Sequence, residues 1–317
     1  MQTVIVAGGA GFIGTHLCES LLSEGYRVIC VDNFLTSKEE KLKNLRNNPN
    51  FSFINHDVTK PLEISEKIDY IFHLASPASP NHHSKISYHA LPEETMHANT
   101  TGTFNLLRLA EKNNARFLFA STSEVYGDPR ENPQNEEYRG NVSTIGPRSV
   151  YDEAKRFGET ITAYFGREKN VDVRIARIFN TFGPGMLKKD MRMVIVFILE
   201  ALNGDPISIF GDGSQTRSLC YVSDTVDGLK RFMFAPNLKG EVINIGSDEE
   251  HSVMEFANLI KKHTGSVSEI KMSEELPKDD PLARKPDIKK AKRLLDWSPK
   301  VPLEEGLSKT IQYFKSL

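Results

Sequence analysis

The stretch Gly8-Gly-Ala-Gly11-Phe-Ile-Gly14 decides the fold, because it follows the β-branched run Thr3–Ala7 and opens a helical pattern. The first glycine permits a tight turn, the second lets the backbone approach a phosphate, and the third lets the helix pack on the strand. Phosphates are favoured at the positive N-terminal end of such a helix. We therefore predict a dinucleotide site here, with Phe12 and Ile13 among its contacts.

A second strand pattern, Arg27–Val31, ends at Asp32. A carboxylate at that place can accept hydrogen bonds from the adenosine ribose and would repel a 2′-phosphate, which favours NAD over NADP. The alternative is a solvated aspartate in an ordinary turn. By position, the other predicted cofactor contacts are Asn33, Asp57, Val58, Leu74 and Ala75.

Short buried-strand patterns alternate with amphipathic stretches through residues 1–180, which is typical of parallel strands joined by crossover helices. The strand candidates are Thr3–Ala7, Arg27–Val31, Phe51–Asn55, Tyr70–Leu74, Arg116–Ala120 and Val171–Ile178. This order predicts an α/β fold with a Rossmann-type doubly wound parallel sheet. Residues 181–317, richer in glycine and proline breaks, are expected to form a smaller substrate-binding lobe, with about 240–262 rejoining the first domain.

The composition favours small-molecule chemistry. The 317 residues carry a net charge of −2, so nothing in the whole chain attracts nucleic acid or a membrane surface. Cys18, Cys30 and Cys220 show no Cys-x-x-Cys spacing, which disfavours disulfides and zinc. No apolar run approaches a membrane span, and the strand pattern begins at Thr3, so we expect a cytoplasmic protein.

Two later segments carry catalytic side chains. Ser121-Thr-Ser-Glu-Val-Tyr-Gly127 follows the fifth strand, and Tyr151-Asp-Glu-Ala-Lys155 places a tyrosine and a lysine on one helical face. A tyrosine acts as a base at neutral pH only after its pKa falls by about 3 units. Lys155 and a nicotinamide ring are the expected positive charges, and Thr122 can bond the same substrate hydroxyl. An isolated Tyr-x-x-x-Lys pair is more often an ordinary helix face.

In this context the chain resembles the extended short-chain dehydrogenases, and within them the UDP-glucuronate decarboxylases (UDP-xylose synthases). The strings that carry the resemblance are His73-Leu-Ala-Ser-Pro-Ala-Ser79, Ser121-Thr-Ser-Glu-Val-Tyr-Gly-Asp-Pro129, Ile145-Gly-Pro-Arg148, Ala176-Arg-Ile-Phe-Asn-Thr-Phe-Gly-Pro184, Gly213-Ser-Gln-Thr-Arg217, Tyr221-Val-Ser-Asp224 and Arg284-Lys-Pro-Asp287. They follow the family's order over nearly the whole chain.

The resemblance implies a set of site residues and a reaction. The catalytic residues would be Thr122, Glu124, Tyr151 and Lys155, and the substrate contacts Ser123, Asn180, Arg192, Arg217 and Arg284. Sugar C4 would be oxidised with NAD, the resulting 4-keto uronate would lose carbon dioxide, and the ketone would be reduced again. A homodimer is also implied. The alternative for the arginines is a set of surface ion pairs.

Other activities remain open at this point. Dehydratases of this family typically have Asp-Glu where this chain has Ser123-Glu124, and epimerases typically lack the glutamate. Three departures concern the uronate: Gly185 replaces an arginine, His97 stands near a typical lysine, and Met191 replaces a glycine, so that Arg192 or Lys188 would have to hold the carboxylate. A dehydrogenase, epimerase or dehydratase of another nucleotide sugar, and a non-catalytic dinucleotide sensor, are the alternatives.

Two further patterns receive a plain interpretation. The histidines His82, His83, His89 and His97 lack the spacing of a helical metal pair, so no metal is predicted. The basic run at 289–293 reads as a solvated helix face, with no nucleic-acid partner.

Overall fold

The computed structural model describes residues 1–277 and 280–317. Its main element is one sheet of seven strands in the order β11-β6-β5-β4-β1-β2-β3, in which every neighbouring pair is parallel. The strands are β1 (Thr3–Ala7), β2 (Arg27–Asp32), β3 (Phe51–Asn55), β4 (Tyr70–His73), β5 (Arg116–Thr122), β6 (Val173–Ile178) and β11 (Val242–Ile245). The predicted Rossmann-type sheet is confirmed. Its direction of growth reverses between β1 and β4, which creates the crevice where such sheets bind ligands.

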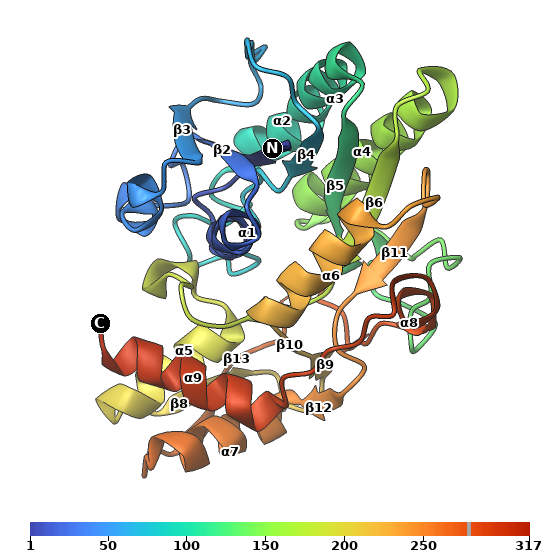
Figure 1. Cartoon of the computed structure of the whole chain (residues 1–317). Coiled ribbons are helices and arrows are strands. Elements are labelled where there is room, and N and C mark those ends of the chain that lie inside the picture. The colour runs from blue at the N-terminus through green and yellow to red at the C-terminus, as the bar shows by residue number, and fades with distance from the viewer. Residues whose placement is uncertain (278–279) are drawn as a thin grey trace.

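Helices cover both faces of this sheet (Figure 1). On one face lie α1 (Phe12–Ser23), α6 (Val222–Phe234) and α8 (Lys289–Leu295), and on the other α2 (Pro92–Asn99), α3 (Thr101–Asn113) and α4 (Ser149–Glu168). The apolar stripe of Leu17, Leu21 and Leu22 is buried against β1 and β2, and α1 ends just before Gly25, which has a φ of +84°. Burial on both faces explains why the strands are almost continuously apolar.

A separate apolar core lies beyond the carboxyl ends of the strands. It is formed by α5 (Met193–Asn203), α7 (Val253–Thr264) and α9 (Leu303–Lys315), together with the pair β8 (Ile207–Phe210) and β13 (Ile270–Glu274). The segment 240–262 contributes to both parts, because β11 joins the main sheet whereas α7 packs on α5 and α9. Figure 1 shows this group beside the C-terminus.

Short elements complete the connections. They are the strands β7 (Thr181–Phe182), β9 (Thr216–Ser218), β10 (Cys220–Tyr221), β12 (Glu250–Ser252) and β14 (Ala283–Arg284), and the 3-10 turns η1 (Glu39–Leu42), η2 (Leu45–Asn47), η3 (Ser123–Tyr126) and η4 (Lys188–Asp190). Across residues 1–277 and 280–317, every helix is too short or too polar to cross a lipid bilayer.

Candidate active site

A cavity of about 610 Å³ lies between the carboxyl ends of the central strands and the second core. Most of the predicted site residues line it, although they come from segments far apart in the chain. They are Gly8, Gly11, Phe12, Ile13, Gly14, Leu74, Thr122, Ser123, Glu124, Tyr151, Lys155, Asn180, Arg192, Arg217 and Arg284. The fold therefore places the predicted cofactor and substrate residues in one space.

The glycine turn has the shape that a dinucleotide needs. Gly8 has a φ of +80°, and a Cβ on it would stand 2.6 Å from the backbone nitrogen of Ala75. A Cβ on Gly14 would stand only 2.2 Å from the carbonyl oxygen of Gly8. Gly11 is the N-cap of α1, where free backbone N–H groups point outward. These residues fit a bound pyrophosphate, because the glycines let the turn pack tightly on its own backbone while the N-terminal end of α1 opens onto the cavity.

Asp32 is fixed at the end of β2. One of its oxygens accepts a hydrogen bond from the backbone of Ala10 at 3.1 Å, and the other accepts from Phe34 at 2.8 Å and from the Ser37 hydroxyl at 3.1 Å. Burial raises the pKa of Asp32, although these hydrogen bonds oppose the shift. The carboxylate thus stands beside the glycine turn, bonded to the backbone of Ala10, and its contact with a ribose stays a prediction.

Asp32 and the remaining predicted cofactor residues, Asn33, Asp57, Val58 and Ala75, are not among the residues that line the cavity. Asn33 is exposed and its side chain accepts from the backbone of Leu35, while Asp57 accepts from Thr59. Val58 is buried, and its Cγ2 lies 2.8 Å from where a Cβ on Gly102 would stand. Ala75 packs on the glycine turn. Their contact with the adenine half of a dinucleotide stays a prediction.

Tyr151 and Lys155 stand one turn apart on α4. The Lys155 ammonium donates to the carbonyl of Ala120 at 2.7 Å and lies 5.7 Å from the centre of the Tyr151 ring. Burial lowers the pKa of Lys155 to about 7. Burial and the Glu124 charge raise the pKa of Tyr151, and a hydrogen bond with Thr122 only partly offsets them. These protein groups alone therefore keep Tyr151 protonated. For Tyr151 to act as a base, the positive nicotinamide ring would have to supply much of the decrease in its pKa.

Glu124 is held between two arginines inside the cavity wall. Arg148 bonds one of its oxygens at 2.5 Å, and Arg284 contacts both oxygens at 2.5 and 2.9 Å. Burial acts in the other direction, but the two guanidiniums lower the pKa of Glu124 to about 2. Asp280 pairs in turn with Arg148 at 3.1 Å and with Arg217 at 2.8 Å. Since Arg217 and Arg284 are 8% and 5% exposed, they are not surface ion pairs.

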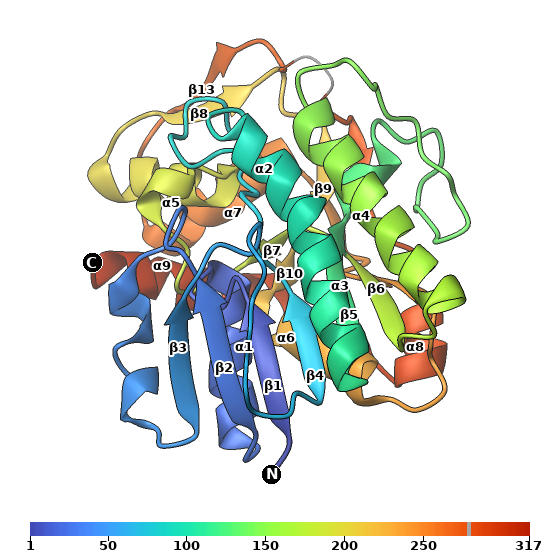
Figure 2. The same cartoon turned by 90° about the horizontal axis from the view of Figure 1, so that it is seen from above.

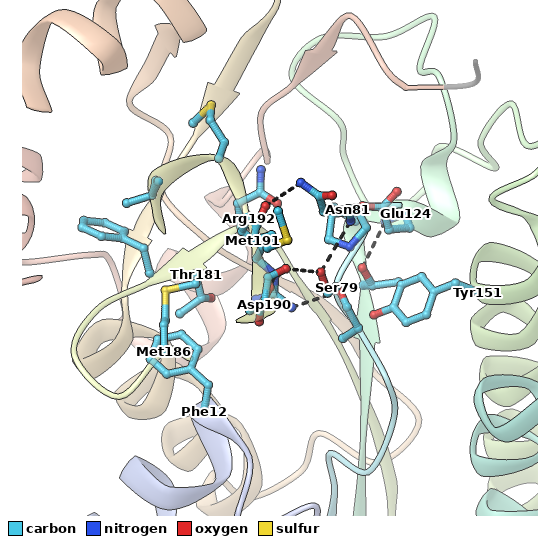
Figure 3. A pocket seen from close by; sticks show the side chains of 18 of the residues that line it. Phe12, Ser79, Asn81, Glu124, Tyr151, Thr181, Met186, Asp190, Met191 and Arg192 are labelled. Atoms are coloured by element: carbon cyan, nitrogen blue, oxygen red, sulfur yellow. Dashed lines mark hydrogen bonds and ion pairs between the residues drawn. The ribbon is translucent and has the colours of Figure 1, made fainter. Parts of the chain in front are cut away.

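Two loops close the cavity opposite Tyr151 (Figure 3). The Ser79 hydroxyl donates to the carbonyl of Asp190 at 2.6 Å, and the Asn81 amide donates to that of Met191 at 2.7 Å. Arg192 donates to the carbonyl of Ala78 at 3.0 Å and pairs with the Asp190 carboxylate at 3.2 Å. The loop after β4 is thus bound to the loop before α5. Met191 adopts a left-handed φ of 57° at this junction.

Several residues of the site were given no role from the sequence. Arg148 belongs to one of the family strings, but only the fold reveals its bond to Glu124. Lys41 lines the cavity near Asp190 and Asp32, and burial lowers its pKa to about 8. Tyr88 is buried behind Tyr151, and no sequence pattern distinguishes it.

The fold also brings together side chains that the histidine spacing did not suggest. His82 and His83 both approach Glu274 of β13, at 3.6 and 3.1 Å, and the donor atoms of the three lie within 4.8 Å of one another. All three are exposed. The shared hydrogen-bonding carboxylate accounts for this contact, which ties the loop after β4 to β13. The expectation of no metal stays a prediction.

The fold and the site together define an NAD-dependent enzyme of nucleotide-sugar type. Residues 4–246 match the NAD dependent epimerase/dehydratase family, and the chain belongs to that family. The cofactor expectation is thereby confirmed, because solved relatives in this family contain NAD.

Within the family, the chain is similar to particular decarboxylases. It is 50% identical over 314 residues to UDP-glucuronic acid decarboxylase 1 of Xenopus tropicalis, covering 99% of this chain and 72% of that protein. It is 47% identical to UDP-glucuronic acid decarboxylase 4 of Arabidopsis thaliana, covering 98% and 68%. Among solved structures, the UDP-glucuronic acid 4-epimerase of Bacillus cereus with UDP-glucuronic acid and NAD has a TM-score of 0.85 at 28% identity, covering 99% of both chains.

Proposed function

We propose that this protein is a UDP-glucuronate decarboxylase that forms UDP-xylose through a 4-keto intermediate. The observation that carries the proposal is the 50% identity to a UDP-glucuronic acid decarboxylase over 99% of the chain. The cavity supports it, because Tyr151, Thr122 and the fixed carboxylate of Glu124 line the same space as the glycine turn. The recycling of the cofactor makes the overall reaction redox-neutral.

The chain's own residues account for the acid–base steps. Tyr151 takes the proton of the sugar 4-hydroxyl, and Lys155 stabilises the resulting phenolate. Gly8, Gly11, Gly14 and Asp32 would hold NAD, which would supply the hydride acceptor for C4 and later the hydride donor. The new ketone is β to the C6 carboxylate, so carbon dioxide can leave with the electrons placed on the enolate oxygen. Tyr151 and Thr122 then stabilise this oxygen as hydrogen-bond donors.

Glu124 serves protonation at C5 through a water molecule. Its pKa of about 2 keeps the side chain ionised throughout the physiological range, so it accepts hydrogen bonds and stores no proton. A carboxylate of this kind can orient a water that donates a proton to C5, and the hydroxide that remains takes up a proton from solvent, so the loss of carbon dioxide consumes one proton overall. Arg148 and Arg284 fix its direction through three short hydrogen bonds.

The arginines and the neighbouring polar groups bind the substrate. Arg217, Arg284, Asn180 and Ser123 line the cavity beyond Tyr151, where guanidinium groups suit the oxygens of a diphosphate. Arg192 is the best-placed cation for the uronate carboxylate, because Asp190 and the carbonyl of Ala78 hold its guanidinium at the cavity wall.

A related C4 chemistry is the second candidate. The similar Bacillus cereus structure is a 4-epimerase of UDP-glucuronic acid, which differs in what happens to the 4-keto sugar. A 4-dehydrogenase or 4,6-dehydratase of another nucleotide sugar would use the same Tyr151. Ser123-Glu124 in place of an Asp-Glu pair disfavours the dehydratase.

A substrate panel tests the proposal. The protein is incubated with NAD and UDP-, GDP- or dTDP-linked sugars, and the products are identified by mass spectrometry. We expect loss of carbon dioxide from UDP-glucuronate without net NADH. Tyr151→Phe should lower turnover by a factor of about 10² to 10⁴ while sparing NAD binding. NADH accumulation on a neutral sugar, with UDP-glucuronate untouched, would assign the second candidate instead.

Three broader features belong to the proposal. Residues 1–180, with β11, would form the NAD-binding part, and most of 181–317 the nucleotide-sugar part, with the cavity between the two cores. The three cysteines are free and buried, which suits a reducing cytoplasmic location. An apolar face on α2 and α4 would form a homodimer interface.

A further inference from the structure

A second tyrosine lies directly against the proposed base. Tyr88 has no exposed surface, and its ring is parallel to that of Tyr151, with centroids 4.8 Å apart and an interplanar angle of 11°. Such a stacked pair adds roughly 0.5–1.5 kcal/mol to simple burial. Because Tyr151 projects from α4 into the cavity, the flat contact restricts its ring to one orientation.

The loop after β4 carries Tyr88 to this place. The backbone N–H of Tyr88 donates to the carbonyl of Ser79 at 3.2 Å, and Ser79 also forms a bridge with Ser87. The Ser79 hydroxyl in turn donates to the carbonyl of Asp190. Ser79 therefore links the loop before α5, which closes the cavity, to Tyr88, whose ring packs on Tyr151.

The hydroxyl of Tyr88 is buried without a partner. Among the described residues, Tyr88 Oη, Arg148 Nε and Asp152 Oδ1 are buried atoms that form no hydrogen bond. Arg148 lies 5.9 Å from the centre of the Tyr88 ring, and Asp152 follows it by one helical turn. An unsatisfied buried polar group costs roughly 1–3 kcal/mol. Within the described part of the chain, the Tyr88 hydroxyl therefore holds no neighbouring side chain, and it is the ring that contacts Tyr151.

Tyr88, Arg148 and Asp152 lie near the ion pair between Glu124 and Arg148. The charged groups that act on Tyr88 are Arg148, Glu124, Asp152 and Arg284. Those that act on Asp152 also include its neighbour Glu153. Arg148 is common to both, and it is the arginine whose other nitrogen bonds Glu124 at 2.5 Å. Arg148 thus bonds Glu124 through one nitrogen and lies 5.9 Å from the centre of the Tyr88 ring.

We propose that Tyr88 is a positioning residue for the reaction, whose ring, stacked on Tyr151, fixes the orientation of the proposed base. This inference rests on the proposed function for the identity of the base, but not for the identity of the sugar. It gives the loop after β4 a role in catalysis.

Two variants separate the ring from the hydroxyl. Tyr88→Phe keeps the stacked ring and removes only the unbonded hydroxyl, so its unfolding temperature should not fall and its kcat should stay within about twofold of the wild type. Tyr88→Leu removes the flat contact, and kcat should drop by about 100-fold with KM changed by less than about twofold. Tyr26→Phe removes a partly buried hydroxyl just before β2, at the end of the sheet away from the cavity, and keeps a ring stacked on Phe234; it is the matched control and should equal the wild type.

A titration supplies a readout that a purely structural role would not move. Leucine covers less of the Tyr151 ring than tyrosine does, so water reaches the ring and the pKa of Tyr151 should fall toward its ordinary value. The ultraviolet absorbance of tyrosinate is followed against pH in each variant, and again in the same variant with the added change Tyr151→Phe. The difference between the two curves gives the titration of Tyr151 alone. The acid limb of kcat should move to lower pH in parallel.

The outcomes separate this inference from the proposed function. Wild-type kcat and an unchanged titration in Tyr88→Leu would overturn the role of the ring. A loss of kcat in Tyr88→Phe as large as that in Tyr88→Leu would also overturn it, because phenylalanine keeps the stacked ring. If the wild type oxidises a different nucleotide sugar, the proposed substrate is wrong, but the same comparison is made on NADH formed from that sugar. The titration needs no substrate, so it decides the matter even without turnover.

Discussion

The ionisation of the site residues depends on partners that are distant along the chain. Glu124 owes its low pKa to Arg148, 24 positions away, and to Arg284, 160 positions away. The sequence could identify Glu124 as a candidate because of its place after the fifth strand. It could not reveal its protonation state, because spacing along the chain says nothing about which cations the fold brings into contact.

Asp152 shows the opposite behaviour and leads to a prediction about pH. Burial and the Glu124 charge raise its pKa to about 8, although Arg148 and Arg284 oppose the shift. Above its ordinary pKa of about 3.9, the unfolded chain has released this proton while the folded chain still holds it. The stability that the bound proton contributes is therefore complete at low pH and is lost as pH rises through about 8.

Asp152→Asn should remove this pH dependence. Between the two pKa values, the free energy of unfolding of the wild type should decline relative to the variant by up to roughly 1.4 kcal/mol per pH unit. Thermal or urea unfolding from about pH 5 to about pH 8 measures the difference. The exposed Asp205→Asn is the control, and its difference from wild type should be flat. A flat profile for Asp152→Asn as well would mean that Asp152 is ionised in the folded protein.

At the scale of elements, the strands were predicted almost to the residue. β5 continues to Thr122 and β6 starts at Val173, and the other candidates match within one residue, because buried parallel strands bounded by turns leave a local signal. The loop from 77 to 90 left no such signal. It has no periodicity of its own, and side-chain bonds such as Ser84 to the carbonyl of Lys189 at 2.5 Å hold it in place. Tyr88 was missed for that reason.

The start of α1 gives a prediction at this scale. In Gly14→Ala the new Cβ would stand 2.2 Å from the Gly8 carbonyl, so either the helix or the turn must move. Alanine is the better helix former, so any loss occurs despite a local gain of roughly 1 kcal/mol. We expect NAD affinity to fall by at least about tenfold, since overpacking of this kind displaces backbone at a cost of about 1–3 kcal/mol.

Calorimetric titration with NAD checks this expectation. Gly25→Ala is the matched control, because Gly25 ends the same helix at a φ of +84° and its Cβ would meet no atom within 4 Å. That variant should lose some stability through backbone strain but keep its affinity for NAD. Equal affinities for both variants would show that the close approach at Gly14 does not shape the cofactor site.

At the scale of the whole molecule, the chain forms cores on either side of one cavity, and the composition gave no hint of their arrangement. The strand pattern of the first 180 residues was enough to predict their sheet. The addition of β11 to that sheet and the placement of Arg217 and Arg284 depend instead on the second core. The family resemblance supplied those arginines. Local patterns cannot do so, because short strands such as β9 and β14 have too few residues for a periodic signal.

The outer helices provide the last prediction. α2 and α4 pack side by side on the face of the sheet seen in Figure 2. Phe157 and Tyr164 are 50% and 40% exposed and stand seven positions apart on one side of α4, while Met96 of α2 is 40% exposed. Large apolar side chains gathered on neighbouring helices mark a protein interface. We expect a homodimer through this face.

Phe157→Glu should convert the dimer into a monomer, because two buried carboxylates would face each other across a twofold axis. Light scattering after size exclusion measures the mass, and Val267→Glu, at a 93% exposed apolar residue outside this face, should remain dimeric. Tyr151 lies on the same helix as Phe157, so the monomer should also lose part of its kcat as α4 becomes less constrained. A wild type that is monomeric at micromolar concentration would refute the interface, whereas a dimeric Phe157→Glu would move it to another face.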